Sequence, residues 1–306
     1  MNMDSLAVIL YSIIRVSTPL IFATMAALIS RKGGLLNMGV EGTMLLSALT
    51  GVIASALTGN LILSVCITIL VAVVISLFIA YMSLKLKADM VLTCIAYNLM
   101  ASGLTIVIMF FVSGDKGTSS SLPSLVMPTI HIPVIQSIPF IGKVVSGHNI
   151  MTYFAFLSVY LVSFFIYKTP LGLRIRAVGE NGHAAESVGI NVEKTQILAF
   201  VISGVFAALG GLYMSMGYLS WFSRDMTAGR GFIGLSAMNL GNGNPVGGLI
   251  AAMLFGTADA ISNSLQSLKI PAEFVLMIPY LSTIVALVVF SILKEKKEVQ
   301  RREAKS

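Results

Sequence analysis

Five side chains of this sequence are of types that often catalyse reactions or bind metal ions: three histidines and two cysteines. They are His131, His148, His183, Cys66 and Cys94. None of the histidines pairs with a carboxylate or a cysteine at the spacing of a metal site. Both cysteines lie in apolar runs, so we expect buried small hydrophobic side chains and no disulfide framework. The sequence therefore predicts no metal site.

The stretch Gly229–Gly234 has the letters of the dinucleotide-binding motif G-x-G-x-x-G. That motif binds a pyrophosphate only where it follows a strand and opens the helix of a Rossmann unit, and no strand precedes it here. The sequence also lacks a nucleophile elbow, a phosphate-binding loop and an H-E-x-x-H helix. We therefore expect a protein that is not an enzyme.

A few polar residues inside apolar segments are more informative. Glu41 follows Asn37 by four residues, so both lie on one face of a helix. A carboxylate at membrane depth is costly and usually functional, so Glu41 either contacts a ligand or gate, or braces a neighbouring helix near the cytoplasmic edge. Asn98 either makes a hydrogen bond between helices or lines a ligand path. Arg230, near the outer boundary, is either a solvated interfacial charge or a substrate contact.

The most polar stretch, Arg174–Ile190, lies between two segments that are each long enough to cross a bilayer. We expect Asn181 to cap a short surface helix, which Gly189 ends in the left-handed conformation. Ala184 and Ala185 give this helix small side chains on one face, which let a partner surface approach closely. The stretch is either an ordinary loop helix or a docking surface, and we favour a docking surface on a permease that a soluble partner drives from the cytoplasm.

The composition indicates the class of fold that positions these residues. Of the 306 residues, 56% are hydrophobic and 11% are charged, and the mean hydropathy is +0.91. Soluble domains carry roughly 25% charged residues, so this chain has too few charges to cover a water-facing surface. The net charge of +7 does not indicate a nucleic-acid partner, because much of the excess lies in the basic tail, residues 294–306. We expect an all-α polytopic membrane protein, since lipid offers the backbone no partners and β-barrel alternation is missing.

A membrane-spanning helix needs about 20 apolar residues. Eight segments reach or approach that length: Leu6–Ser30, Thr43–Leu57, Leu61–Leu84, Val91–Val112, Ile150–Tyr167, Gln196–Tyr218, Val246–Ser262 and Phe274–Leu293. A shorter segment, Gly231–Leu240, is bounded by glycines. We therefore expect one transmembrane permease domain over residues 1–293, built as a bundle of about 8–10 helices with glycine-interrupted segments.

Lysine and arginine indicate the orientation of these spans, because they favour the cytoplasmic side. The basic clusters are Arg31-Lys32, Lys85/Lys87, Lys168/Arg174/Arg176/Lys194 and the C-terminal tail. Residues 168–194 and the C-terminus should then be cytoplasmic, and residues 113–149 should form an external loop. That loop is either a connector or a docking surface for an external partner. Arg15 leaves undecided whether the whole first segment crosses the membrane. Its side chain snorkels to the surface, faces the protein interior, or belongs to a stretch of about 15 residues that lies on the membrane surface.

Glycine interrupts the apolar pattern twice, at residues 33–42 and at residues 228–245, in opposite halves of the chain. Paired interruptions of this kind indicate the substrate path of transporters built from internal repeats. The two halves share no sequence identity that supports a duplication.

Several blocks of the sequence resemble a known family. The run G-E-N-G-H-A-A-E-S-V-G-I, residues 179–190, is similar to the coupling loop of ABC-importer permeases of the branched-chain amino acid/ribose type. Residues 34–42 resemble that family's N-L-G-V-E-G block, with Met38 in place of the usual leucine. Residues 91–98 resemble its T-L-M-L-N segment.

The remaining blocks resemble the nucleoside/simple-sugar subgroup of that family. They are the run M-T-A-G-R-G-F-I at residues 226–233, Pro271, and Ile278–Leu281 in the last span. The blocks cover nearly the whole chain in order, and the chain resembles the shorter of two paired nucleoside permeases. Gly241–Pro245 departs from the pattern, because relatives usually carry bulkier or basic residues before this proline.

The resemblance implies a transmembrane subunit of an ATP-driven importer in the cell membrane of a bacterium. An external binding lipoprotein would deliver a nucleoside, a second and non-identical permease subunit would complete the path, and separate ATPase subunits would bind ATP and magnesium, so this chain needs no cofactor. The residues implied for ATPase coupling are Glu180, Asn181, Ala184, Ala185, Gly189 and Ile190. The residues expected to line the path are Asn37, Glu41, Asn98, Thr227 and Arg230.

Alternatives stay open at this point. A ribose or galactose permease of the same family would carry the same blocks. An ion-coupled secondary transporter would need a carboxylate inside the membrane, for which we identify Glu41 alone. A membrane enzyme is less favoured, because the polar residues include no catalytic set.

Overall fold

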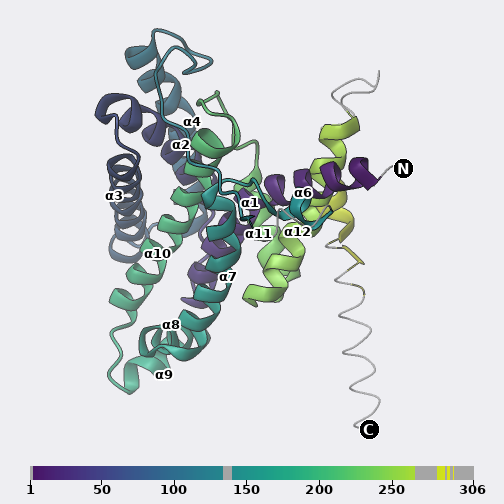
Figure 1. Cartoon of the computed structure of the whole chain (residues 1–306). Coiled ribbons are helices and arrows are strands. Elements are labelled where there is room, and N and C mark those ends of the chain that lie inside the picture. Colours follow the sequence, from purple (N-terminus) through teal and green to yellow (C-terminus); the bar gives the residue numbers. More distant parts are fainter. Residues whose placement is uncertain (1–2, 134–139, 266–280, 287, 290–291, 293–306) are drawn as a thin grey trace.

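The computed structural model describes residues 3–133, 140–265, 281–286, 288–289 and 292. The helices are α1 (Met3–Lys32), α2 (Val40–Thr58), α3 (Leu61–Ala80), the π-helix η1 (Tyr81–Lys85), α4 (Met90–Ser113), α6 (Ile141–Val145), α7 (Ile150–Lys168), α8 (Pro170–Glu180), α9 (Gly182–Ser187), α10 (Val192–Tyr213), the π-helix η2 (Met214–Tyr218), α11 (Arg230–Leu240) and α12 (Pro245–Leu265). The part of the chain that the structure describes is a helical bundle without sheets (Figure 1). The all-α prediction is thereby confirmed.

Seven helices of the described residues are long and apolar enough to cross a membrane. Each corresponds to one of the segments read from the sequence, within a few residues at either end. The short segment Gly231–Leu240 corresponds to α11. The predicted span Phe274–Leu293 lies mostly outside the described residues.

Polar side chains set the starts of several helices. The caps accept hydrogen bonds from the backbone N–H groups of the first turn, which have no partner within the helix. They are Asn60 for α3, Asp89 for α4, Asn149 for α7, Thr169 for α8 and Asn191 for α10. Short polar residues between apolar runs therefore mark the helix boundaries in this chain.

Helix α1 lies at the centre of the bundle and packs against α7, α10, α11 and α12. Small residues bring the backbones close: a Cβ on Gly256 of α12 would overlap the Ser17 hydroxyl, and one on Gly211 of α10 would overlap the Met44 carbonyl. Close approach at small residues replaces the hydrophobic effect as the source of helix association in lipid.

Helix α3 buries a narrow stripe of small side chains, Ser64, Thr68, Ala72 and Ser76, at a spacing of four residues. Its large apolar side chains point away from the bundle, where lipid covers them in a membrane. Cys66 is exposed with them, whereas Cys94 is buried. The prediction of burial is thus wrong for Cys66, because the interior-facing side of this helix is the small and polar one.

The chain has two distinct ends, which α7 separates (Figure 1). At one end, Lys85 forms an ion pair of 3.0 Å with Glu193, near the start of α10, so two of the predicted basic clusters lie together there. At the other end, the backbone N–H of Met127 donates to the carbonyl of Met216 at 2.8 Å, which joins segment 113–149 to η2.

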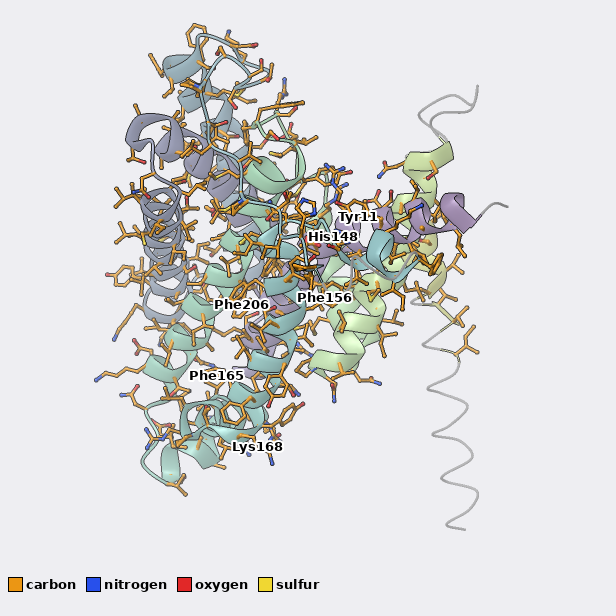
Figure 2. All side chains as sticks on the ribbon, in the orientation of Figure 1. Tyr11, His148, Phe156, Phe165, Lys168 and Phe206 are labelled. Atoms are coloured by element: carbon orange, nitrogen blue, oxygen red, sulfur yellow. The ribbon has the colours of Figure 1, made fainter. Side chains whose placement is uncertain are left out.

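The N-terminal part of α1 belongs to the same end as segment 113–149. The hydroxyl of Tyr11 donates to the Gly147 carbonyl at 3.0 Å, and its ring stacks on that of His148 with centroids 4.0 Å apart. Figure 2 shows these two rings together, far from Lys168 at the other end of α7. Figure 1 shows the first turns of α1 extending sideways from the bundle, beside α6.

Candidate functional site

Glu41, in the first turn of α2, binds the start of α11. Its Oε1 accepts a hydrogen bond from the Gly229 N–H at 2.8 Å, and its Oε2 accepts one from the Gly231 N–H at 2.6 Å. These N–H groups lie at a helix N-terminus, where they have no helical partner and where the dipole favours an anion. The absence of a Cβ at Gly231 matters, because a Cβ would lie 2.6 Å from the Glu41 nitrogen. Glu41 therefore joins the two glycine-interrupted segments, as the bracing alternative predicts.

Two amide side chains hold the stretch that leads into α2. Asn98 of α4 donates to the Met38 carbonyl and accepts from the Gly42 N–H, both at 2.9 Å. Asn37 is fully buried and donates to the Ser203 hydroxyl at 2.9 Å. The first interruption is therefore tied to α4 on one side and to α10 on the other.

Arg230, at the start of α11, forms an ion pair of 3.0 Å with Asp259 of α12. The side chains are only 16% and 14% exposed, so the structure does not favour the solvated interfacial charge, one of the two alternatives for Arg230. The guanidinium also lies 3.5 Å from the carbonyl of Thr227, whose side chain is buried. A guanidinium and a carboxylate that leave water together neutralise each other.

Asp259 was missed in the sequence, although it lies inside the predicted span Val246–Ser262. The statement that Glu41 alone provides an intramembrane carboxylate is therefore wrong. The signal was an acidic residue within an apolar run, which normally marks a functional or paired position.

The five predicted path residues thus lie on, or directly against, the two glycine-interrupted segments. Their polar atoms are largely engaged with the protein itself, so they can fix the shape of a passage and the positions of α2 and α11. Among the described residues, no group of three or more histidine, cysteine or carboxylate side chains is arranged to hold a metal ion.

The polar stretch 174–190 folds as two short helices at the opposite end from segment 113–149. Asn181 caps α9 by accepting from the Ala184 N–H at 3.0 Å, as predicted. At its other end, the Gly189 N–H donates to the Glu186 carbonyl at 2.9 Å and the Ile190 N–H to the Ala185 carbonyl at 3.0 Å. Gly189 has a φ of +85°. This is a Schellman ending, so the predicted left-handed glycine is confirmed.

The outer surface of α9 is not the predicted face of paired alanines. Ala184 is exposed, but Ala185 is buried, because neighbouring residues of a helix point about 100° apart. Val188 and Glu180 are exposed beside Ala184. The exposed side chains of this surface therefore include two carboxylates, Glu180 and Glu186, together with the apolar Ala184 and Val188.

Gly179, which the sequence reading did not single out, seats α8 on the end of α1. A Cβ at Gly179 would overlap the carbonyl oxygen of Lys32, and a Cβ at Gly34 would lie 3.2 Å from the Gly179 Cα. Gln196 of α10 donates to the Gly33 carbonyl at 3.4 Å. The surface helices therefore rest directly on the connector that leads to Asn37 and Glu41.

Two open grooves flank α9, with volumes of about 440 and 520 Å³. The first is lined by Leu171, Arg174 and Lys194 among others, and the second by Leu84, Glu186 and Glu193. Both are bounded by Gly189–Asn191. This end of the chain thus offers a hollowed, mixed-charge surface around a capped helix.

Comparison with known proteins decides the family. The model of the family described as "Branched-chain amino acid transport system / permease component" matches residues 8–292. The chain belongs to this permease family. It is therefore a multi-pass transport subunit, and not an enzyme.

Three relatives show which transport proteins of the family this chain is similar to. This permease is 30% identical to the nucleoside ABC transporter permease protein NupC of Lactococcus lactis, over 94% of this chain and 93% of NupC. It is 34% identical to the guanosine ABC transporter permease protein NupQ of Bacillus subtilis, over 93% and 92%. It is 33% identical to TsgC13 of Haloferax volcanii, provisionally named a glucose ABC transporter permease protein, over 89% and 82%.

Proposed function

We propose that this permease is the transmembrane subunit of an ATP-driven importer for nucleosides, in the cell membrane of a bacterium. The observation that carries the proposal is the α8–α9 surface, whose helix is capped at both ends and which rests through Gly179 on the start of the α1–α2 connector. Similarity to NupC and NupQ over more than nine-tenths of each chain supports nucleosides as the substrate class.

In this proposal, closure of a partner ATPase pushes on the exposed part of α9. ATP and magnesium are bound by that partner. The displacement passes from Gly179 to the backbone of Lys32 and Gly34, and then along the connector to Glu41. Because Glu41 holds the N-terminus of α11, α2 and α11 move as a pair. Such a rigid-body shift between two packings alternates access to a path.

The path runs beside the two glycine-interrupted segments. We propose that its walls are shaped by Asn37, Glu41, Asn98, Thr227 and Arg230. The apolar remainder of the walls keeps binding weak, so that the ligand can leave.

In this proposal the α8–α9 end and the C-terminal tail lie in the cytoplasm, which the excess of lysine and arginine there supports. Segment 113–149 then faces outward and receives a ligand-loaded lipoprotein. A second, non-identical permease completes the transporter. The similarity to NupB of L. lactis, a second nucleoside permease of the same organism as NupC, supports such a pair.

A sugar importer is the second candidate, because TsgC13 has a provisional name as a glucose permease and is similar to most of this chain. Both candidates use the same coupling surface, so only the substrate separates them. An ion-coupled carrier has less support, since Asp259 is engaged with Arg230 and Glu41 with two backbone N–H groups.

The test is uptake into proteoliposomes that hold this permease with its second permease, ATPase and binding protein. Labelled guanosine and uridine are compared with labelled ribose and glucose, each with and without ATP and with and without this subunit. We expect ATP-dependent nucleoside uptake that requires this chain. ATP-dependent uptake of a sugar alone would replace the nucleoside assignment, and nucleoside uptake driven by an ion gradient without the ATPase would refute the pump.

A further inference from the structure

Arg15 is a cation within an apolar span, and its side chain lies on the surface of the chain. Its Nη2 donates to the Tyr218 carbonyl at 2.6 Å, and its guanidinium carbon lies 4.5 Å from the centroid of the Tyr218 ring. Among the described residues, no carboxylate forms an ion pair with it. A guanidinium has five N–H donors, so most of them remain available. A cation in this position is a functional-site candidate, because burying it in lipid is costly.

The fold aims this side chain by means of a proline. Pro19 has no N–H, so the carbonyl of Arg15, four residues earlier, has no helical donor. The hydroxyl of Tyr213 takes that place and donates to the Arg15 carbonyl at 2.9 Å. Tyr213 is fully buried on α10, so this bond fixes the register of α1 against α10 at Arg15.

Tyr218 is presented by a local distortion of α10. The five residues that follow α10 form the π-helix η2, and Tyr218 is its final residue. π-turns are uncommon and are frequently found at functional sites. The Tyr218 ring is half-buried, and its centroid lies 6.5 Å from that of the Tyr213 ring, so the buried Tyr213 ring supports it from the interior.

Behind the pair lies a recess of only about 10 Å³, which is lined by Val16, Pro19, Met214, Tyr218 and Arg230. This volume cannot admit a ligand ring. The surface that remains available is the outer, exposed face of the Arg15 guanidinium, with the Tyr218 ring beneath it.

We propose that Arg15 and Tyr218 form a stacking platform for the base of the nucleoside. Bases stack on aromatic rings and on the guanidinium planes of arginine in proteins that bind unpaired nucleotides. A free sugar offers the platform only C–H groups, whereas a base offers a flat π face to the guanidinium, so we expect the platform to favour nucleosides over free sugars. The inference rests on the proposed nucleoside function and names the residues that read the base.

The test uses the complete reconstituted transporter with 4-thiouridine, a photoreactive nucleoside. We expect light-induced adducts on the peptides that contain Arg15 or Tyr218 during turnover. We also expect uridine uptake at saturating binding protein to fall about tenfold in Tyr218→Leu and in Arg15→Met, because stacking of one base contributes on that scale. Tyr218→Phe keeps the ring and should stay near the wild-type rate. Tyr160→Leu, at an exposed tyrosine of α7, is the matched control and should have no effect.

The outcomes separate the two proposals. A wild-type transporter that takes up no nucleoside refutes the proposed function and the platform together. Nucleoside uptake that stays at the wild-type level in Tyr218→Leu and Arg15→Met, or adducts found only elsewhere, overturns the platform alone. If Arg15→Lys retains full uptake while Arg15→Met loses membrane insertion, Arg15 binds lipid headgroups and the platform is wrong. Adducts on the unaltered protein keep the test decisive if a variant fails to assemble.

Discussion

Gly179 of α8 lies so close to Lys32 of α1 that any Cβ at Gly179 would overlap the Lys32 carbonyl oxygen. Nothing but glycine fits between the surface helices and the end of the central helix. The two backbones are therefore in direct contact, and a displacement of α8 is passed to α1 without a compressible side chain between them.

A first prediction concerns the exposed part of the α8–α9 surface. Charge reversal Glu180→Lys combined with Ala184→Trp should abolish nucleoside-stimulated ATP hydrolysis, because both side chains point outward where a partner would dock. Membrane insertion should be unchanged, since neither side chain is buried. ATPase assays on the reconstituted complex check this, with Tyr160→Leu, at an exposed tyrosine of α7, as control. Normal stimulation in the double variant would remove this surface from the coupling.

A second prediction concerns the bond between α2 and α11. Glu41→Ala should lower the free energy of unfolding by about 1–3 kcal/mol, because two N–H groups of α11 lose their acceptor. Thermal unfolding in detergent measures this, and Glu186→Ala, at an exposed carboxylate of α9, should shift stability by less than about 0.5 kcal/mol. Unchanged stability with complete loss of uptake would instead indicate that Glu41 acts on the ligand.

A third prediction concerns the ion pair between α11 and α12. Arg230→Met leaves Asp259 as an unpaired buried charge, which should destabilise the chain by about 3–5 kcal/mol. Adding Asp259→Leu should recover most of this loss, because two apolar side chains replace a neutralised pair. A double-mutant cycle by thermal unfolding separates the terms. Additive effects of the two single variants would show that the pair is not coupled.

A fourth prediction concerns the end that carries His148. Burial lowers the pKa of His148 below its ordinary value of 6.5. The hydrogen bond with the Val144 carbonyl opposes this shift in pKa less strongly, and the charge of Arg15 adds a still smaller lowering. The unfolded chain therefore binds a proton more readily than the folded one. The stabilisation is complete above pH 6.5 and is lost as the pH falls through the folded-state value.

The protection of residues 141–149 against hydrogen exchange, after correction for the intrinsic pH dependence of amide exchange, should accordingly be high at neutral pH and lower at about pH 5. Protonation would charge a ring that stacks on Tyr11 and lies near Tyr153. His148→Gln should remove this pH dependence. Equal protection at both pH values in the unaltered protein, after the same correction, would show that this end does not respond to His148.

The sequence predicted the helices well because their signals are local. Apolar runs ended by Asn60, Asp89 and Asn191 define spans that no tertiary contact needs to specify, and the cap and the left-handed glycine of α9 follow from neighbouring residues. The site depends on contacts between distant segments. Glu41 accepts hydrogen bonds from two N–H groups about 190 positions away in the chain, and no local sequence pattern indicates such a contact. Asp259, in contrast, could have been predicted, because it is an acidic residue within an apolar run.

The most direct test of the coupling account measures ATP hydrolysis and uridine uptake on the same proteoliposomes for Gly179→Val. The added side chain must lift α8 from Lys32, so hydrolysis should continue while uptake falls about tenfold or more, since small misplacements of functional groups have effects of that size. Gly182→Ala is the matched control, because a Cβ there meets only the Val192 side chain at 3.7 Å. Wild-type uptake per ATP hydrolysed in Gly179→Val would contradict transmission through the α8–α1 contact.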